Sequence, residues 1–63
     1  MEINRVKSIM ALHGDTGRDL AKRLKITETS VYNKLGGKNQ FTVAEVETMA
    51  KHYKVNINYF FKK

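Results

Sequence analysis

The segment from residue 16 to residue 35, TGRDLAKRLKITETSVYNKL, constrains the fold of this chain more than any other part. Apolar side chains recur three and four residues apart along it, as on one face of a helix, and they do so twice. Only Lys25 and Ile26 separate the two patterns. The segment therefore predicts two short amphipathic helices, over about residues 16–24 and 27–35, joined by a tight turn. The apolar positions are Leu20, Ala21, Leu24, Ile26, Val31 and Leu35.

Helical patterns also lie on both sides of this segment. An apolar repeat from Val6 to His13 predicts a first helix over residues 4–13. The sequence of residues 42–45 is a capping box and predicts the start of a fourth helix, while Asn56 is placed to cap a fifth over residues 57–61. No alternating strand pattern is present. We therefore expect an all-α fold, a compact bundle of five short helices.

Length and composition narrow the class of protein. Sixty-three residues predict one domain, residues 1–63, with a small core. The absence of cysteine excludes disulfides and thiolate metal sites. No apolar run approaches the roughly 18–20 residues of a membrane span, and no signal-peptide pattern is present. We therefore expect a soluble cytoplasmic protein with no membrane partner.

The positive charge is concentrated on the paired helices. The net charge is +6, and residues 16–40 hold six basic against two acidic side chains. Such a concentration is typical of a surface that binds a polyanion, although an ordinary solvated basic surface is the alternative. A short helix leading through a tight turn into a second helix is the helix-turn-helix unit, whose second helix enters the DNA major groove. Together, these features favour DNA binding.

The order and spacing of the motifs resemble the helix-turn-helix domain of phage repressors and Cro proteins, and of related bacterial regulators. The resemblance spans residues 4–61. Besides the paired helices, it is carried by residues 35–38, residues 41–43 and the ending over residues 55–61, which look like a subgroup common in mobile elements of Gram-positive bacteria. It implies a lambda repressor-like fold and a transcriptional regulator acting on the bacterial nucleoid.

Two positions depart from the family's pattern. Family members usually have a glutamine at the start of the second helix, where this chain has Gly17, so that side-chain contact is lost. The family also favours glycine in the turn, where this chain has Lys25. A left-handed lysine costs about 1 kcal/mol, and a different turn geometry is the alternative.

The exposed face at the start of helix 27–35 is the predicted reading surface. By resemblance, Glu28, Thr29 and Asn33 take the base-contacting positions, and Tyr32 shares their face. Glu28 can accept from cytosine N4, Thr29 can contact thymine, and Asn33 can pair with adenine. Tyr32 can reach a thymine methyl or a phosphate. The alternatives are that Glu28 only favours the helix start, and that Tyr32 packs on a loop or partner.

Phosphate contacts would position the domain without reading bases. The start of helix 16–24 presents backbone N–H groups to an anion, and Gly17 there allows a close approach. Polar side chains after residue 33 are placed to hold the DNA backbone on the other side. The predicted phosphate contacts are Arg5, Thr16, Gly17, Arg18, Lys34, Lys38, Asn39 and Gln40.

A single module of this kind reads few base pairs, so we expect a homodimer on a double-stranded operator. The candidates for the dimer contact are Tyr59, Phe60 and Phe61, with the alternative that Phe60 closes the core. The competing function is a helical protein–protein interaction module, an antitoxin or adaptor with the same fold.

No catalytic constellation is evident. His13 and His52 are the only histidines and lie far apart in the sequence, without cysteine. His13 is expected at the end of the first helix or the edge of the core. Zinc binding and acid–base catalysis are not expected. We therefore expect no enzyme activity, cofactor, metal or small-molecule ligand.

Overall fold

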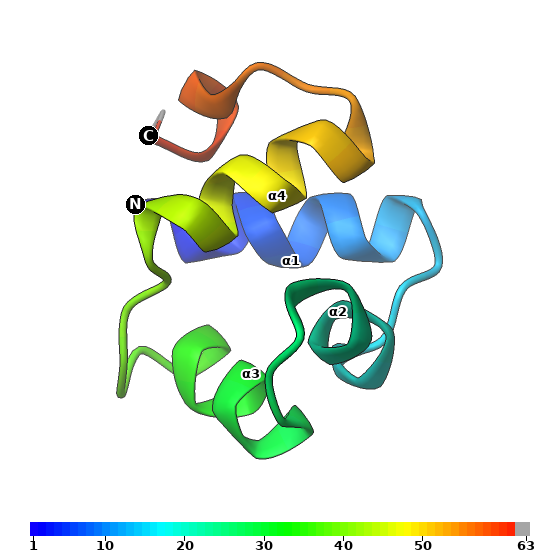
Figure 1. Ribbon diagram of the computed structural model, residues 1–63. Helices are drawn as coiled ribbons and strands as arrows, with labels where there is room; N and C mark the ends of the chain where they lie inside the picture. The colour runs from blue at the N-terminus through cyan, green and yellow to red at the C-terminus, as the bar shows by residue number, and fades with distance from the viewer. Residues whose placement is uncertain (62–63) are drawn as a thin grey trace.

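The computed structural model describes residues 1–61, which form helices joined by short turns and loops, with no strand among them (Figure 1). The α-helices are α1 (Ile3–Leu12), α2 (Gly17–Leu24), α3 (Glu28–Leu35) and α4 (Val43–Tyr53), and a 3-10 helix, η1 (Ile57–Phe61), follows them. The expected all-α fold is confirmed. In this part of the chain, no helix combines the length and the apolar character needed to cross a membrane.

Local sequence sets the starts of α2, α3 and α4, while α1 begins at Ile3 and ends at Leu12, one residue earlier at each end than expected. The Thr16 and Thr42 side chains each accept a hydrogen bond from the backbone N–H three residues later, and Asp19 and Glu45 bond back to complete two capping boxes. Thr27 caps α3 in the same way through the Ser30 N–H. These caps confirm the expected starts at residues 16, 27 and 42, each of which is the residue before its helix.

The fifth helix is a correction to the sequence-based expectation. Residues 57–61 form a 3-10 helix, so the bundle contains four α-helices and one short, tighter helix. Asn56 does act at its start: its side-chain oxygen accepts from the Asn58 N–H at 2.8 Å, and its carbonyl accepts from the Tyr59 N–H at 2.9 Å. A segment this short makes bonds between residues three apart more readily than a full α-helical ladder.

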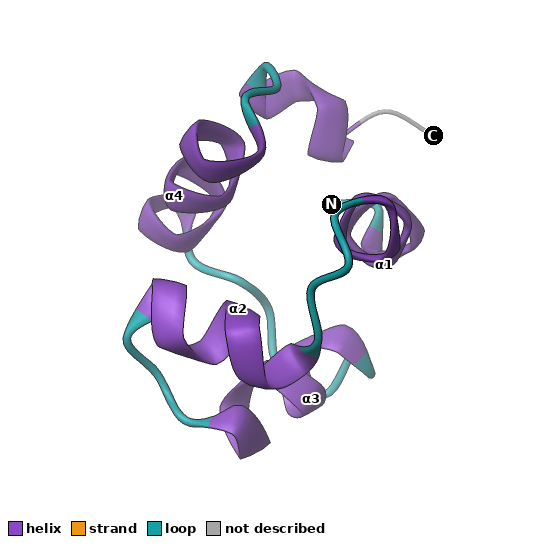
Figure 2. Cartoon of the chain, turned by 90° about the vertical axis from the view of Figure 1, so that its right-hand side faces the viewer, coloured by secondary structure: helices purple, strands orange, loops and turns teal. Residues whose placement is uncertain are grey.

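One core joins all five elements. The predicted apolar face of α1 is buried as far as Met10, while His13 at its end is exposed. Buried side chains from the other α-helices are Leu20, Ala21, Val31, Val46, Met49, Ala50 and Tyr53. Phe60 of η1 is fully buried, and its carbonyl accepts a hydrogen bond from the Glu2 N–H at 2.7 Å. Figure 2 shows α2 and α3 together at one end of the molecule and η1 at the other. In the α2–α3 pair, α2 packs against α4 and α3 packs against α1.

The turn between α2 and α3 keeps the left-handed geometry despite its lysine. Lys25 has φ 59° and ψ 41°, and its N–H and that of Ile26 both donate to the Ala21 carbonyl. Ile26 is half-buried and packs against the core. The hydrogen bonds and this apolar contact therefore hold the turn against the strain of a non-glycine residue.

Candidate nucleic-acid interface

The four side chains that the sequence predicts to contact bases differ in how far they are exposed on α3. Glu28 and Thr29 are exposed in its first turn, Tyr32 is 52% exposed, and Asn33 is half-buried. Val31 on the opposite face is fully buried and anchors the helix to the core. The start of α3 is therefore open to solvent on one side, and Val31 packs into the core on the other.

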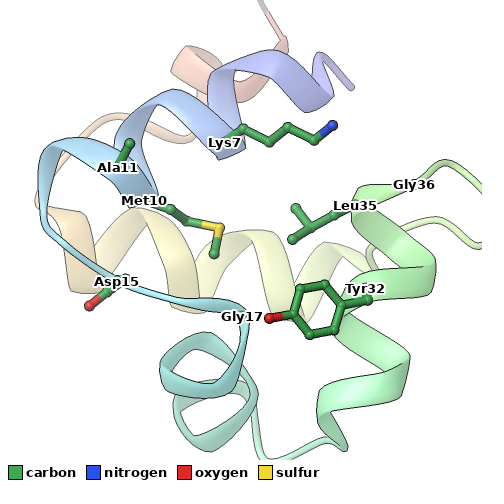
Figure 3. Close-up of a pocket in the computed structure, with 8 residues that line it drawn as sticks. All are labelled: Lys7, Met10, Ala11, Asp15, Gly17, Tyr32, Leu35 and Gly36. Carbon is green, nitrogen blue, oxygen red and sulfur yellow. The ribbon is translucent and has the colours of Figure 1, made fainter.

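Tyr32 lies across the start of α2, directly over Gly17. A Cβ added to Gly17 would meet the Cζ, Cε1 and hydroxyl of Tyr32 at 2.7–2.9 Å, and Gly17 is buried. Figure 3 shows the phenol ring pointing toward Gly17, with Met10 and Leu35 facing the same space. Gly17 is therefore covered by a side chain where the sequence predicts an open approach, and its contact with a phosphate stays a prediction. The ring takes the space that a glutamine side chain at this position would need.

The start of α2 is also occupied by its own carboxylate. Asp19 Oδ2 accepts from the Thr16 N–H at 2.9 Å and from the Thr16 hydroxyl at 3.0 Å. The backbone hydrogen bond from Thr16, followed by that from its hydroxyl, lowers the pKa of Asp19. The N–H and hydroxyl of Thr16, which the sequence predicts to contact a phosphate, are thus already bonded to the carboxylate of Asp19. Arg18 is exposed beside it.

Lys34 is not a free cation. Its Nζ lies 2.6 Å from Glu45 Oε1 in α4, and both side chains are largely buried. Burial by itself raises the pKa of Glu45, but the hydrogen bonds from Lys34 and from the Thr42 N–H outweigh it and lower that pKa overall. Lys34 also lies 5.7 Å from the centre of the Phe41 ring. Lys34 therefore ties α3 to α4, and its contact with a phosphate stays a prediction.

The loop after α3 folds back onto Asn33. The N–H groups of Lys38 and Asn39 donate to the Asn33 carbonyl at 2.9 and 3.3 Å. Asn39 and Gln40 are exposed and share a polar pocket of about 220 Å³ with Asn33 and Ser30. Ser30 was missed at the sequence level, although its position three residues before Asn33 places it on the same side of a helix.

Arg5 lies away from these residues. Its guanidinium carbon is 5.1 Å from the centre of the Tyr59 ring, so the side chain packs against η1 rather than beside α3. Lys7, which sequence reasoning passed over, lines the pocket that contains Tyr32 and Gly36 (Figure 3). In the sequence, the only indication that Lys7 lies beside the buried face of α1 is its spacing of three residues from the apolar Met10.

A second polar cluster joins the α1–α2 connection to α4. Asp15 Oδ2 accepts from the Tyr53 hydroxyl at 2.8 Å and lies 3.3 Å from His52 Nε2. The His13 ring is tilted by 47° against the Tyr53 ring, with 4.9 Å between the ring centres. Burial, followed by the bond to Asp15, raises the pKa of Tyr53. Sequence reasoning found no such constellation because Asp15 and Tyr53 lie 38 positions apart. Within residues 1–61, no group of acidic and histidine side chains is suited to hold a metal ion.

The three candidates for a dimer contact differ in exposure. Phe60 is fully buried, so it closes the core and its assignment to a dimer contact is wrong. Tyr59 is half-buried between Arg5 and Phe60. Phe61 alone is strongly exposed.

Five basic side chains of α2, of the turn after it and of the loop after α3 are exposed to solvent. They are Arg18, Lys22, Arg23, Lys25 and Lys38.

Comparison of the chain with models of protein families, with curated proteins and with solved structures finds no match.

Proposed function

We propose that this chain is a sequence-specific double-stranded DNA-binding transcriptional regulator, similar to a phage repressor or Cro protein. The observation that carries the proposal is the polar face of α3, where Glu28 and Thr29 are exposed and Asn33 is half-buried, while Val31 on the other side is buried in the core. A helix supported on one face and polar on the other is suited to enter the major groove and reach base edges. The protein would act by occupying an operator and excluding polymerase.

The pairing of α2 with α3 supports this proposal. The two helices pack together and are joined only through Lys25, Ile26 and Thr27. In a helix-turn-helix unit, the first helix crosses the DNA backbone while the second lies in the groove. With η1 as its fifth element, the bundle would then be a compact lambda repressor-like domain covering the chain.

The chemistry of the exposed side chains favours discrimination between bases over raw affinity. An asparagine can pair with adenine through two hydrogen bonds, and a glutamate can accept from cytosine. Placing the Glu28 carboxylate in a groove lined by phosphates costs binding free energy unless a base donates a hydrogen bond to it. Glu28 would therefore disfavour binding to sequences that lack such a base. The exposed cations supply the sequence-independent attraction.

Selection from randomised duplex DNA at moderate salt, followed by sequencing, tests the proposal. We expect enrichment of a short palindrome. Asn33→Ala should then relax the preference at one position of each half-site by about 1–3 kcal/mol. Asn58→Ala is the matched control, because Asn58 is exposed on η1, away from α3. Weak, salt-sensitive binding without an enriched sequence would overturn the proposal and favour the protein–protein interaction module.

A further inference from the structure

Arg5 and four residues near the end of the chain line a hollow outside the proposed DNA-binding surface. The hollow has a volume of about 420 Å³ and is formed by α1, the turn after α4 and η1. Its lining residues are Arg5, Val55, Asn56, Asn58 and Tyr59. η1 lies at the opposite end of the molecule from α2 and α3 (Figure 2). This site, the Arg5 hollow, is therefore separate from the polar face of α3.

The polar side chains of the Arg5 hollow can all donate hydrogen bonds. The donors are the guanidinium of Arg5, the amides of Asn56 and Asn58 and the hydroxyl of Tyr59. The Asn56 side-chain oxygen already accepts from the Asn58 N–H at 2.8 Å, which leaves its NH₂ group to donate. No aspartate or glutamate of residues 1–61 lines the hollow or forms an ion pair with Arg5. One cation among neutral donors, without a carboxylate, suits an anionic ligand.

Tyr59 holds the Arg5 side chain in place. The guanidinium carbon lies 5.1 Å from the centre of the Tyr59 ring, and that ring packs edge-on against buried Phe60, with 5.4 Å between the ring centres. Arg5 and Tyr59 are both half-buried. An arginine that is already ordered loses less side-chain entropy on binding, and its planar fork matches the two oxygens of a carboxylate. The contact with Tyr59 therefore prepares Arg5 for a carboxylate ligand.

The composition of the Arg5 hollow favours a protein carboxylate over a DNA phosphate. A DNA backbone is held by rows of cations, whereas Arg5 is the only cation of residues 1–61 that lines the hollow. Val55 and the Tyr59 ring add apolar surface, which suits the apolar neighbour of an acidic residue. The net charge of +6 attracts an acidic partner.

We propose that the Arg5 hollow binds an acidic segment of a partner protein. A side-chain carboxylate of the partner is held by the Arg5 guanidinium and the two asparagine amides, and an adjacent apolar side chain lies against Val55. Because η1 is at the other end of the molecule from α2 and α3, this partner can bind while α3 contacts DNA.

NMR titration of the full 63-residue, isotope-labelled protein with a capped tetrapeptide of alternating glutamate and leucine tests this site. We expect saturable shift changes confined to Arg5 and residues 55–59. Arg5→Gln should weaken binding about tenfold, because it removes a charge-assisted hydrogen bond. Lys54→Gln is the matched control, since it removes a positive charge beside Val55 from a residue that does not line the hollow. Circular dichroism checks both folds.

A second variant and a second peptide separate the site from a loss of packing. Asn58→Ala removes an exposed side chain, leaves the Arg5–Tyr59 contact in place and should still weaken binding about threefold. A tetrapeptide of glutamine and leucine lacks the carboxylates and should not bind at the same concentrations. Binding of both peptides with equal affinity would overturn the carboxylate site.

Other outcomes would also overturn it. Shift changes centred on α2 and the loop after α3, or an equal loss of affinity in Lys54→Gln and Arg5→Gln, would mean a general attraction of anions. No saturable change at millimolar peptide would leave the hollow without its ligand. Displacement of the peptide by a random-sequence duplex would assign the hollow to phosphate, and shifts at Arg5 that grow with protein concentration alone would assign it to a second copy. The selection of a DNA sequence through α3 is measured separately and does not depend on this site.

Discussion

The ring of Tyr32 in α3 fills the space over Gly17 in α2 where any larger residue would place its Cβ. This contact couples one residue of the proposed reading helix to the start of the helix before it. The coupling explains why a glycine stands at the first position of α2 although glycine is a poor helix former.

Gly17→Ala should displace the Tyr32 ring rather than unfold the domain, because the atoms it meets lie at the end of a flexible side chain. The lost contact should offset the roughly 0.5–1 kcal/mol that alanine contributes in a helix, leaving stability nearly unchanged. With Tyr32→Ala already present, Gly17→Ala should stabilise by that full amount. Chemical denaturation of the two single variants and the double variant measures this coupling. Equal stabilisation in both backgrounds would show that the ring does not restrict Gly17.

Tyr53→Phe should lower the free energy of unfolding by about 1–2 kcal/mol at pH 7, because it removes the donor to Asp15. Tyr59→Phe is the control, since the Tyr59 hydroxyl lies outside this cluster. The pKa of Tyr53 is raised above its ordinary value of 10.0. Its contribution is therefore complete below pH 10 and is lost as the pH rises toward the folded-state pKa. Thermal melts should show a steeper alkaline loss for the parent than for Tyr53→Phe; parallel curves would contradict this.

Glu45→Gln should cost about 1–2 kcal/mol at neutral pH, because it weakens both the ion pair with Lys34 and the cap of α4. The pKa of Glu45 lies below its ordinary value of 4.5 in the folded protein. Its stabilising contribution is therefore present above pH 4.5 and is lost as the pH falls through the folded-state pKa. Urea unfolding from pH 7 to pH 3 should show the difference between parent and variant shrinking. A difference that stays constant down to pH 3 would rule out the ionised carboxylate as its source.

Replacing Lys38 by glutamine should weaken binding to all DNA sequences alike and reduce the slope of log K against log salt by about one. Lys34→Gln should change that slope less, because Lys34 is already paired with Glu45. Titrations at several salt concentrations compare the two variants. An equal change for both would mean that Lys34 leaves its partner to contact a phosphate.

Lys54→Gly should stabilise the fold by about 1 kcal/mol, since Lys54 ends α4 with φ 57°, a conformation that glycine adopts without strain. The expected rise in Tm is about 4–8 °C. Lys54→Ala removes the same charge but keeps the strain, so it should give no comparable gain. If alanine stabilised as much as glycine, the charge rather than the backbone would be responsible.

The helices could be predicted because their signals are local. Thr16 with Asp19 and Thr42 with Glu45 form caps over three residues, and the apolar faces of α1 and α4 repeat within one or two turns. The end of the chain was less accurately predicted. The five residues of η1 carry helical periodicity, but periodicity does not distinguish an α-helix from a 3-10 helix over so short a segment.

Helical content, helix starts and most of the core follow from the sequence alone, since these depend on spacings of three and four residues. Which surface side chains stay free depends instead on how the helices pack. Packing of α3 on α2 placed Tyr32 over Gly17, and packing of α4 gave Lys34 a partner 11 positions away. The relative placement of helices sets such contacts through the shapes of many buried side chains at once. No local spacing therefore reveals that one expected phosphate ligand is paired and another covered.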